Sequence, residues 1–417
     1  MMPPRSTGMR TFTMIWFGQI ISLLGSAMTW FAFTIWVWQK TEQASSLAAI
    51  NTLAFLPSIL LMPIAGTFVD KWERKTTLIL SDLGSVTATL IALLLYHAGS
   101  LALWHIYLLS LFAGIFTAFQ YPAYVAATTA LVSKDDYARA QGMVGLAQAA
   151  STIFAPMIAA ALLPSIGLSG IMTIDLLTFV FAFSILLWIK FPLRSDLTPA
   201  PVTQTGFARE VSFGFRSIFA NPTLRALTIL FVVANFFLAI GATLLAPTIL
   251  SHTANSEGAL AAILSIGAAG GLIGGGLLSV WGGPKRKVNG ILLGGVAACL
   301  IGISLFGLAR SVLIWGIASF FFSFFEPFVE GSNTALWQST VEINAQGRVF
   351  SARQLLTQIP YLIGMAGSGW LAELGIARFT GTQNGIHLST TLVLAGLAGS
   401  AVFIIGYFAP PIRKIQE

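Results

Sequence analysis

Two acidic residues, Glu326 and Glu330, stand in the phenylalanine-rich segment FFSFFEPFVEGSNTALW, residues 321–337. At this spacing on an α-helix their carboxylates share one face. An ionised carboxylate in the middle of a bilayer costs at least about 2.5–3.5 kcal/mol, and two adjacent like charges cost more. We therefore expect the pair to face water, to meet a cation, or to hold at least one proton. The alternative is structural: one carboxylate makes an interhelical hydrogen bond and the other lies in water near a helix end.

The composition around these acids is that of an integral membrane protein. The 417 residues are 56% hydrophobic and only 9% charged, which is too little charge to cover a soluble surface. Because one spanning helix needs about 20 mostly apolar residues, the long apolar runs predict an all-α fold. The first run, 11–39, is expected to be a retained span and not a cleaved signal peptide. The twelve predicted spans are 11–39, 46–69, 77–97, 101–130, 141–163, 170–189, 223–250, 259–281, 290–309, 312–338, 354–376 and 388–409.

The basic residues predict the orientation of these spans. Of the 22 lysines and arginines, all but Lys40, Arg310 and Arg378 fall on one side of the predicted membrane. Because basic loops stay on the cytoplasmic side, both termini are expected in the cytoplasm. The charges cap short loops and form no patch with interleaved aromatics, which argues against a nucleic-acid partner.

The chain divides into two halves with weak internal similarity. The stretch 66–75, GTFVDKWERK, aligns with 276–285, GLLSVWGGPK, and nearly the same offset places Arg139 on Arg348. Parallel repeats of this kind are typical of transporters with a site between two bundles. We expect an N-terminal six-helix bundle at 1–194, a cytoplasmic linker at 195–222 and a C-terminal six-helix bundle at 223–417.

Enzymatic chemistry finds little support in the sequence. The lone cysteine, Cys299, has no partner for a disulfide, and neither metal-ligand spacing nor a nucleophile–base set occurs. The glycine run GAAGGLIGGGLL, 267–278, lacks the G-K-S/T of a phosphate loop, so we interpret it as small residues that permit close helix packing. We expect no cofactor, no metal and no ATP drive.

Three motifs resemble the major facilitator superfamily, in the branch that contains macrolide-efflux proteins and enterobactin exporters. They are FGQIISLLGSAMTWFAFTIWVWQKT at 17–41, PIAGTFVDKWERKTTLILSDL at 63–83 and QGRVFSARQ at 346–354, and the resemblance covers essentially the whole chain. It implies two pseudo-symmetric bundles of six transmembrane helices. The sequence departs from the family pattern at Phe68, Lys71 and Glu73, and alanines replace the glycines of an antiporter motif near residue 155, which weakens the inference of antiport.

The resemblance implies roles for two loops. The loop between the second and third spans acts in the family as a conformational latch, while simple positive-inside charge is the alternative. The second half has Val280 where Asp70 would fall, so we expect an asymmetric latch. The latch residues are Gly66, Asp70, Lys71, Arg74 and Asp82, and the second signature contains Gly347 and Arg348.

The resemblance also implies that the tenth helix lines a central cavity, which would give Glu326 access to water. The residues expected beside Glu326 in that cavity are Gln19, Trp30, Gln120, Tyr124, Asn235 and Phe236. Two further polar residues, Asp175 and His105, are expected to have structural roles, as a helix cap or pairing group and as a hydrogen-bonded interfacial ring respectively.

These observations together predict a monomeric secondary transporter in the plasma (inner) membrane. It would export hydrophobic or amphipathic compounds, macrolide-, drug- or siderophore-like, in exchange for protons, with Glu326 as the proton-exchanging group and Glu330 assisting. Alternatives are a mover of lysophospholipids or other lipids, an uncoupled facilitator, and a non-transporting membrane sensor or scaffold.

Overall fold

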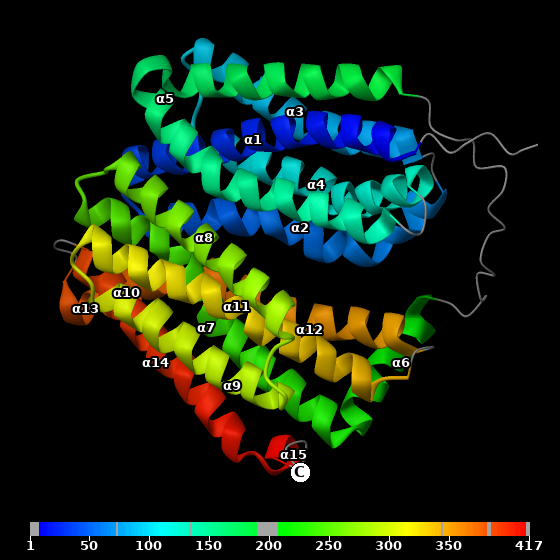
Figure 1. Cartoon of the computed structure of the whole chain (residues 1–417). Coiled ribbons are helices and arrows are strands. Elements are labelled where there is room, and N and C mark those ends of the chain that lie inside the picture. Colours follow the sequence, from blue (N-terminus) through cyan, green and yellow to red (C-terminus); the bar gives the residue numbers. More distant parts are fainter. Residues whose placement is uncertain are drawn as a thin grey trace, which may run out of the picture. The chain divides into compact units, whose positions relative to one another are not determined.

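The computed structural model describes residues 8–71, 74–132, 136–189, 207–342, 345–381 and 385–413. Every secondary-structure element in these ranges is helical, which confirms the predicted all-α fold (Figure 1). Ten segments of the described chain are long and apolar enough to span a membrane.

The predicted number of twelve spans is not matched one for one. One of the ten segments, Gly142–Trp188, is 47 residues long and contains Gly167, whose φ of 66° and ψ of −178° interrupt the helix. This glycine lies between the predicted spans 141–163 and 170–189. The helix α12 (Gln346–Trp370) is 25 residues long but is not among the ten. A total of twelve stays a prediction.

The described chain forms two compact units. Unit 1 comprises Met1–Lys40 and Ala49–Pro201, and unit 2 comprises Thr41–Ala48 and Val202–Glu417. The helices that contribute to unit 1 are α1 (Gly8–Thr41), α2 (Ala44–Lys71), α3 (Arg74–His97), α4 (Leu103–Leu131) and α5 (Tyr137–Trp188) (Figure 1).

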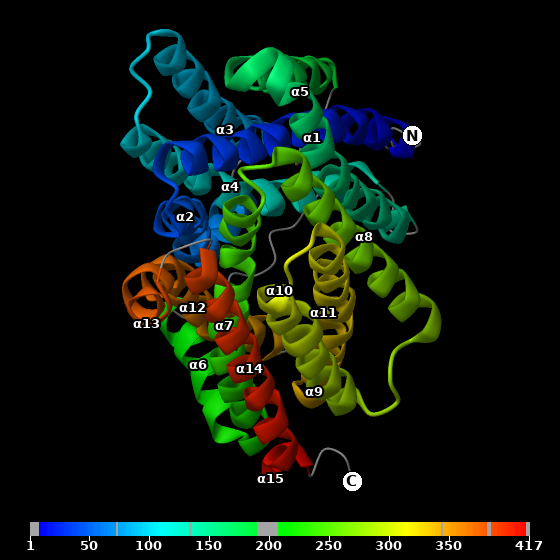
Figure 2. The ribbon, with the colours of Figure 1, turned by 90° about the vertical axis from the view of Figure 1, so that its left-hand side faces the viewer.

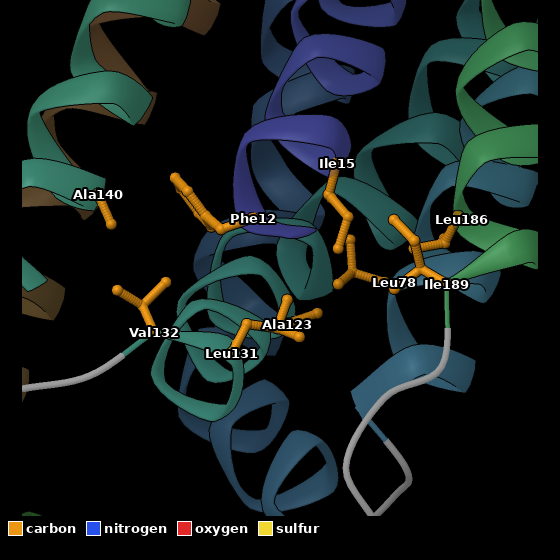
Figure 3. Packing of buried hydrophobic residues seen from close by; sticks show 9 residues of the cluster. All are labelled: Phe12, Ile15, Leu78, Ala123, Leu131, Val132, Ala140, Leu186 and Ile189. Carbon is orange, nitrogen blue, oxygen red and sulfur yellow. The ribbon is translucent and has the colours of Figure 1, made fainter. Parts of the chain in front are cut away.

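An apolar cluster of buried side chains packs within unit 1 (Figure 3). Phe12 and Ile15 of α1 pack there with Leu78 of α3, together with residues of α4 and α5 and of the segments that follow them. Leu78 is fully buried and Phe12 is 1% exposed. Four residues after Ile15 and Leu78, the same two helices carry polar residues, Gln19 and Asp82. Packing in the cluster therefore fixes the rotation of α1 and α3 about their own axes. This rotation sets the direction of Gln19 and Asp82, one helical turn further along.

Unit 2 contains the remaining elements (Figure 2). They are α6 (Phe207–Ala220), α7 (Pro222–His252), α8 (Glu257–Trp281), α9 (Lys287–Ala297), the π-helical turn η2 (Ala298–Ser304), α10 (Leu305–Leu308), α11 (Val312–Thr340), α12, the π-helical turn η4 (Leu371–Ile376), α13 (Ala377–Thr380), α14 (Ile386–Phe408) and α15 (Pro410–Arg413).

Local sequence signals set the bounds of several helices in unit 2. Asn221 accepts hydrogen bonds from the backbone N–H groups of Thr223 and Leu224, at 2.9 and 3.3 Å, and caps α7, whose first residue is proline. Ser256 caps α8 in the same way. Gly282 ends α8 with a φ of 76°, a left-handed conformation that glycine adopts without a steric penalty.

The amphipathic helix α6 lies within the stretch 195–222 that the sequence predicts as a linker. Its glycine, Gly214, packs so closely on α12 that an added Cβ would collide with the carbonyl oxygen of Arg348. Ile218 is fully buried with Trp337 and other apolar residues of unit 2. This part of the stretch is therefore a packed element of unit 2.

Candidate functional site

One face of α1 lines a cavity of about 400 Å³ within unit 1. The lining residues of α1 recur at helical spacing, so they form a single stripe along the helix. They are Trp16, Gln19, Ser22, Leu23, Ser26, Thr29, Trp30 and Phe33. The other walls come from α2, α3, α4 and α5, and they combine apolar side chains with a similar number of polar ones, a mixture that suits a small-molecule site.

Two groups of polar contacts, called layers here, involve residues of this stripe. The first layer is centred on Asp82 of α3, which contacts Gln19 of the stripe. Its two carboxylate oxygens accept hydrogen bonds from Gln19 Nε2 at 2.9 Å and from Gln120 Nε2 at 3.0 Å. Both amides turn their nitrogen toward the carboxylate, which leaves their carbonyl oxygens as acceptors. Tyr124, one turn beyond Gln120 on α4, also lines the cavity. The motif groups Asp82 with the latch, whereas the structure brings it together with two predicted cavity residues.

The second polar layer is built around Asp175 of α5. Ser26 Oγ donates to Oδ1 at 2.9 Å, and Thr89 Oγ1 donates to Oδ2 at 3.0 Å. Asp175 is only 2% exposed, yet it is one of the residues that line the cavity. The layers repeat with one spacing, since Ser26 follows Gln19 and Thr89 follows Asp82 by seven residues each. Seven residues are two helical turns, or about 10.5 Å.

A glycine allows α1 to approach α5 at this second layer. A Cβ added to Gly25 would lie 3.1 Å from the Cα of Asp175 and would collide with the hydroxyl oxygen of Thr178. The small residue therefore brings the α1 backbone against α5, and this approach places Ser26 within hydrogen-bonding distance of the carboxylate. The neighbouring hydroxyl residues Ser26 and Thr89 were not among the predicted site residues, although their seven-residue spacing from Gln19 and Asp82 is visible in the sequence.

In unit 2 the two glutamates of α11 have different surroundings. Glu330 forms an ion pair with Arg353 of α12 and also accepts from Asn333 Nδ2 at 3.3 Å and Thr334 Oγ1 at 3.2 Å. Glu326 is exposed, and the described residues offer it no hydrogen bond or ion pair. Of the three expected solutions for a buried acid, Glu330 has the cation.

The arginine of this ion pair was missed as a site residue, although it lies in the quoted segment QGRVFSARQ. The motif draws attention to Gly347 and Arg348. Arg348 instead places its guanidinium 4.2 Å from the ring centroid of Phe213 on α6. Gly347 lies in α12, but its surroundings are outside the description. The signal for Arg353 was the expectation of a cation as one of three possible environments for the two acids.

The other predicted residues are spread over both units. Asn235 Nδ2 of α7 donates to the carbonyl oxygen of Thr357 on α12 at 3.2 Å. The carbonyl oxygen of Phe236 abuts Gly364, where a Cβ would collide with it. His105 Nδ1 accepts from the backbone N–H of Ala102 at 3.0 Å, at the start of α4.

The latch residues are described only in part. The backbone of Gly66, Asp70 and Lys71 lies in α2, and α3 begins at Arg74. Their side chains lie outside the described part of the structure. Among the described residues, no group of three or more His, Cys, Asp or Glu side chains could hold a metal ion.

Comparison with known proteins gives one consistent family. The model of the Major Facilitator Superfamily matches residues 15–365. Macrolide efflux protein A of Streptococcus pyogenes is 29% identical over 419 aligned residues, covering 97% of this chain and 96% of that protein. The enterobactin exporter EntS of Shigella flexneri is 25% identical over 223 residues, which cover 52% of each.

Solved structures share the fold at low identity. The nucleoside transporter NupG, solved as a mutant, aligns with a TM-score of 0.76 and 12% identity over 96% of this chain and 98% of that one. A bacterial homologue of the lysosomal transporter Spinster aligns with a TM-score of 0.72 and 14% identity over 99% of both chains. With a family model that matches most of its length, this chain belongs to the Major Facilitator Superfamily and is a multi-pass membrane transporter, not an enzyme.

Proposed function

We propose that this transporter exports hydrophobic or amphipathic small molecules from the cytoplasm by alternating access, in antiport with protons. The observation that carries the proposal is the cavity of about 400 Å³ in unit 1. Its walls combine apolar and aromatic side chains with polar groups. Such a surface binds amphipathic compounds by apolar contact and orients them by a small number of polar contacts.

Export as the direction is supported by the relatives. Macrolide efflux protein A and the enterobactin exporter EntS are both named for outward transport, and the former aligns over nearly the whole chain. The distribution of lysine and arginine supports cytoplasmic termini in a plasma membrane. Substrate would then enter from the cytoplasm or the inner leaflet.

Proton exchange is proposed at Glu326 on the strength of its contrast with Glu330. The charge of Glu330 is offset by Arg353, whereas Glu326, one turn earlier on the same helix, has no cation among the described residues. An intramembrane carboxylate without a cation is costly, and a proton removes that cost. In this scheme protonation of Glu326 favours one conformation, and substrate binding favours the other.

The test uses inside-out vesicles that contain the protein and are energised with an acid interior. Uptake of lipophilic dyes and macrolides is followed before and after the pH gradient is collapsed. The variants are Glu326→Gln and, as a matched control, Glu342→Gln, which removes one exposed carboxylate just after α11.

Wild-type protein and Glu342→Gln are expected to accumulate substrate only while the gradient persists, and Glu326→Gln is expected to lose this dependence. Full gradient-driven uptake by Glu326→Gln would reject the assignment of Glu326. Uptake that is independent of the pH gradient in every variant would reject proton antiport and favour a facilitator. No uptake of any compound by the wild-type protein would count against export of this substrate class.

A further inference from the structure

We propose that the unit-1 cavity binds organic cations and that Asp175 supplies the negative charge that recognises them. The ligand class is an amphipathic molecule with one permanent or protonated cationic centre, such as an ammonium or phosphonium ion. This inference rests on the proposed function in that it treats the cavity as the place where substrate binds.

The carboxylate of Asp175 has unused acceptor capacity. Its two oxygens each accept one hydrogen bond, from Ser26 and from Thr89. A carboxylate offers about four acceptor positions, so these hydroxyls leave part of that capacity open. Asp175 belongs to the cavity lining, and a ligand in the cavity can therefore reach the open part.

The donors that contact Asp175 are neutral hydroxyls, and they offset only part of the free-energy cost of burying an ionised carboxylate. A charge taken out of water is costly unless an opposite charge accompanies it. Hydroxyl groups alone would serve a neutral amide at this position at lower cost. Among the described residues, the Asp175 carboxylate is 2% exposed, is held by hydroxyls and has no positive charge beside it, and a cationic ligand in the cavity would supply that charge.

The rest of the cavity favours a cation over an anion. None of the described residues that line it is a lysine, an arginine or a histidine. The second carboxylate, Asp82, takes up the N–H donors of Gln19 and Gln120, so those amides present carbonyl oxygens to their other neighbours. When Asp175 is ionised, its negative charge is therefore not offset by a basic side chain of the described lining.

An aromatic side chain lies on the same stripe of α1 as Ser26, the residue that donates to the Asp175 carboxylate. Trp30 lies four residues after Ser26, so the two side chains share one helix face, and both line the cavity. The face of a tryptophan attracts cations through its quadrupole, most strongly where water is excluded. A cavity lined by both a carboxylate and an aromatic face would distinguish an organic cation from an uncharged molecule of similar shape.

The test measures binding and not transport, so that its outcome is independent of export. Purified full-length protein in lipid nanodiscs is titrated with tetraphenylphosphonium, a permanent cation, and with uncharged triphenylphosphine oxide. The variants are Asp175→Asn, which removes the charge and keeps the shape, and Asp175→Glu, which keeps the charge. Glu42→Gln is the control, because it removes one carboxylate from the exposed turn between α1 and α2.

The wild-type protein should bind the phosphonium at least about tenfold more tightly than the oxide. Asp175→Asn should lose this preference without a change in oxide binding, whereas Asp175→Glu and Glu42→Gln should retain it. Equal binding of the two probes by the wild-type protein would overturn the proposal, even if the Asp175→Asn protein does not fold. Unchanged phosphonium affinity in folded Asp175→Asn would overturn it as well.

The two proposals fail separately. Charge-selective binding that depends on Asp175, in a protein that moves nothing in vesicles, would retain the cation site and reject export. Export of uncharged compounds by a protein without charge-selective binding would retain the proposed function and reject the cation site.

Discussion

Arg353 of α12 and Glu330 of α11 form an ion pair, one helical turn from a glutamate that has no cation among its described neighbours. The pair gives two acids of one helix face different environments. Because Glu330 is neutralised, its repulsion of Glu326 is reduced, and the charge of Glu326 can change without a second uncompensated charge beside it. Arg353 is thus a positioning residue for the proposed proton exchange.

Removal of this cation should impair export more than stability. In Arg353→Gln we expect gradient-driven uptake to fall by about tenfold, because the two glutamates, one helical turn apart, then repel each other with no cation to offset their charge. The melting temperature should change little, since a half-exposed ion pair contributes about 0–1 kcal/mol. The measurements are vesicle uptake and a thermal unfolding scan on the same preparation.

The double variant Glu330→Gln/Arg353→Gln is the control for this prediction. It removes both charges together, so it should recover a substantial part of the uptake lost in Arg353→Gln. If the double variant is as impaired as the single one, Arg353 acts by some route other than the charge of Glu330.

The hydrogen bonds to Asp82 should contribute to the stability of unit 1. Gln19→Leu leaves Oδ2 of Asp82 without the donor that now lies 2.9 Å away. An unsatisfied buried acceptor costs about 1–3 kcal/mol, so the melting temperature should fall by several degrees. Gln120→Leu removes the other donor and should have a similar effect.

Gln148→Leu provides a matched control, because Gln148 lines the same cavity and its side chain has no hydrogen bond to another described residue. Its melting temperature should stay near that of the wild-type protein. A fall as large as that of Gln19→Leu would show that the loss of cavity polarity, and not the loss of the bond to Asp82, is responsible.

Much of the fold can be predicted from the sequence because a bilayer imposes a length and a composition on each span. The apolar runs fall close to the observed helices, and the glycine run 267–278 indeed packs closely, in α8. The helix α6 was not predicted, since it has 14 residues and alternates apolar with polar ones, and no apolar run marks it.

The site could be predicted only as a set of residue types. Gln19, Gln120, Asp82 and Asp175 all attract attention as polar groups in apolar helices. Which donor meets which carboxylate depends on the rotation of α1, α3, α4 and α5 about their own axes, and that rotation is fixed by packing between distant segments. The partner of Glu330 lies 23 residues away, beyond a loop, so helical spacing could not reveal it.

The close approach of α1 to α5 gives a further prediction. In Gly25→Ala the new methyl group would lie against the Cα of Asp175 and the hydroxyl of Thr178. Overpacking of this kind costs about 1–3 kcal/mol, so the melting temperature should fall. The displacement of α1 should also weaken binding of tetraphenylphosphonium, because Ser26 would move away from Asp175.

Gly142→Ala is the matched control in α5, where no atom lies within 4 Å of an added Cβ. Alanine in a helix interior is favoured over glycine by about 0.5–1 kcal/mol, so this variant should melt at the same temperature or higher. A comparable loss in both variants would mean that the crossing at Gly25 has no special steric demand.

The crossing of α8 and α11 in unit 2, visible in Figure 2, depends on two glycines of the run 267–278. A Cβ at Gly270 or at Gly274 would collide with the backbone carbonyl oxygen of Phe320 or of Phe324, respectively. A backbone atom of a continuous helix cannot rotate away, so the helices must separate. We expect Gly270→Ala and Gly274→Ala each to lower the melting temperature by several degrees.

The same run contains its own control, because a Cβ at Gly276 meets nothing within 4 Å. Gly276→Ala should therefore be neutral or slightly stabilising, although it lies only two residues from Gly274. Thermal unfolding of the three variants in one detergent separates the two explanations for the run. If all three alanines act alike, the glycines serve backbone flexibility; if only Gly276→Ala is tolerated, they serve the contact with α11. Glu326 and Glu330 lie on α11, so separation of α8 and α11 would displace them. The destabilised variants should therefore lose gradient-driven uptake as well.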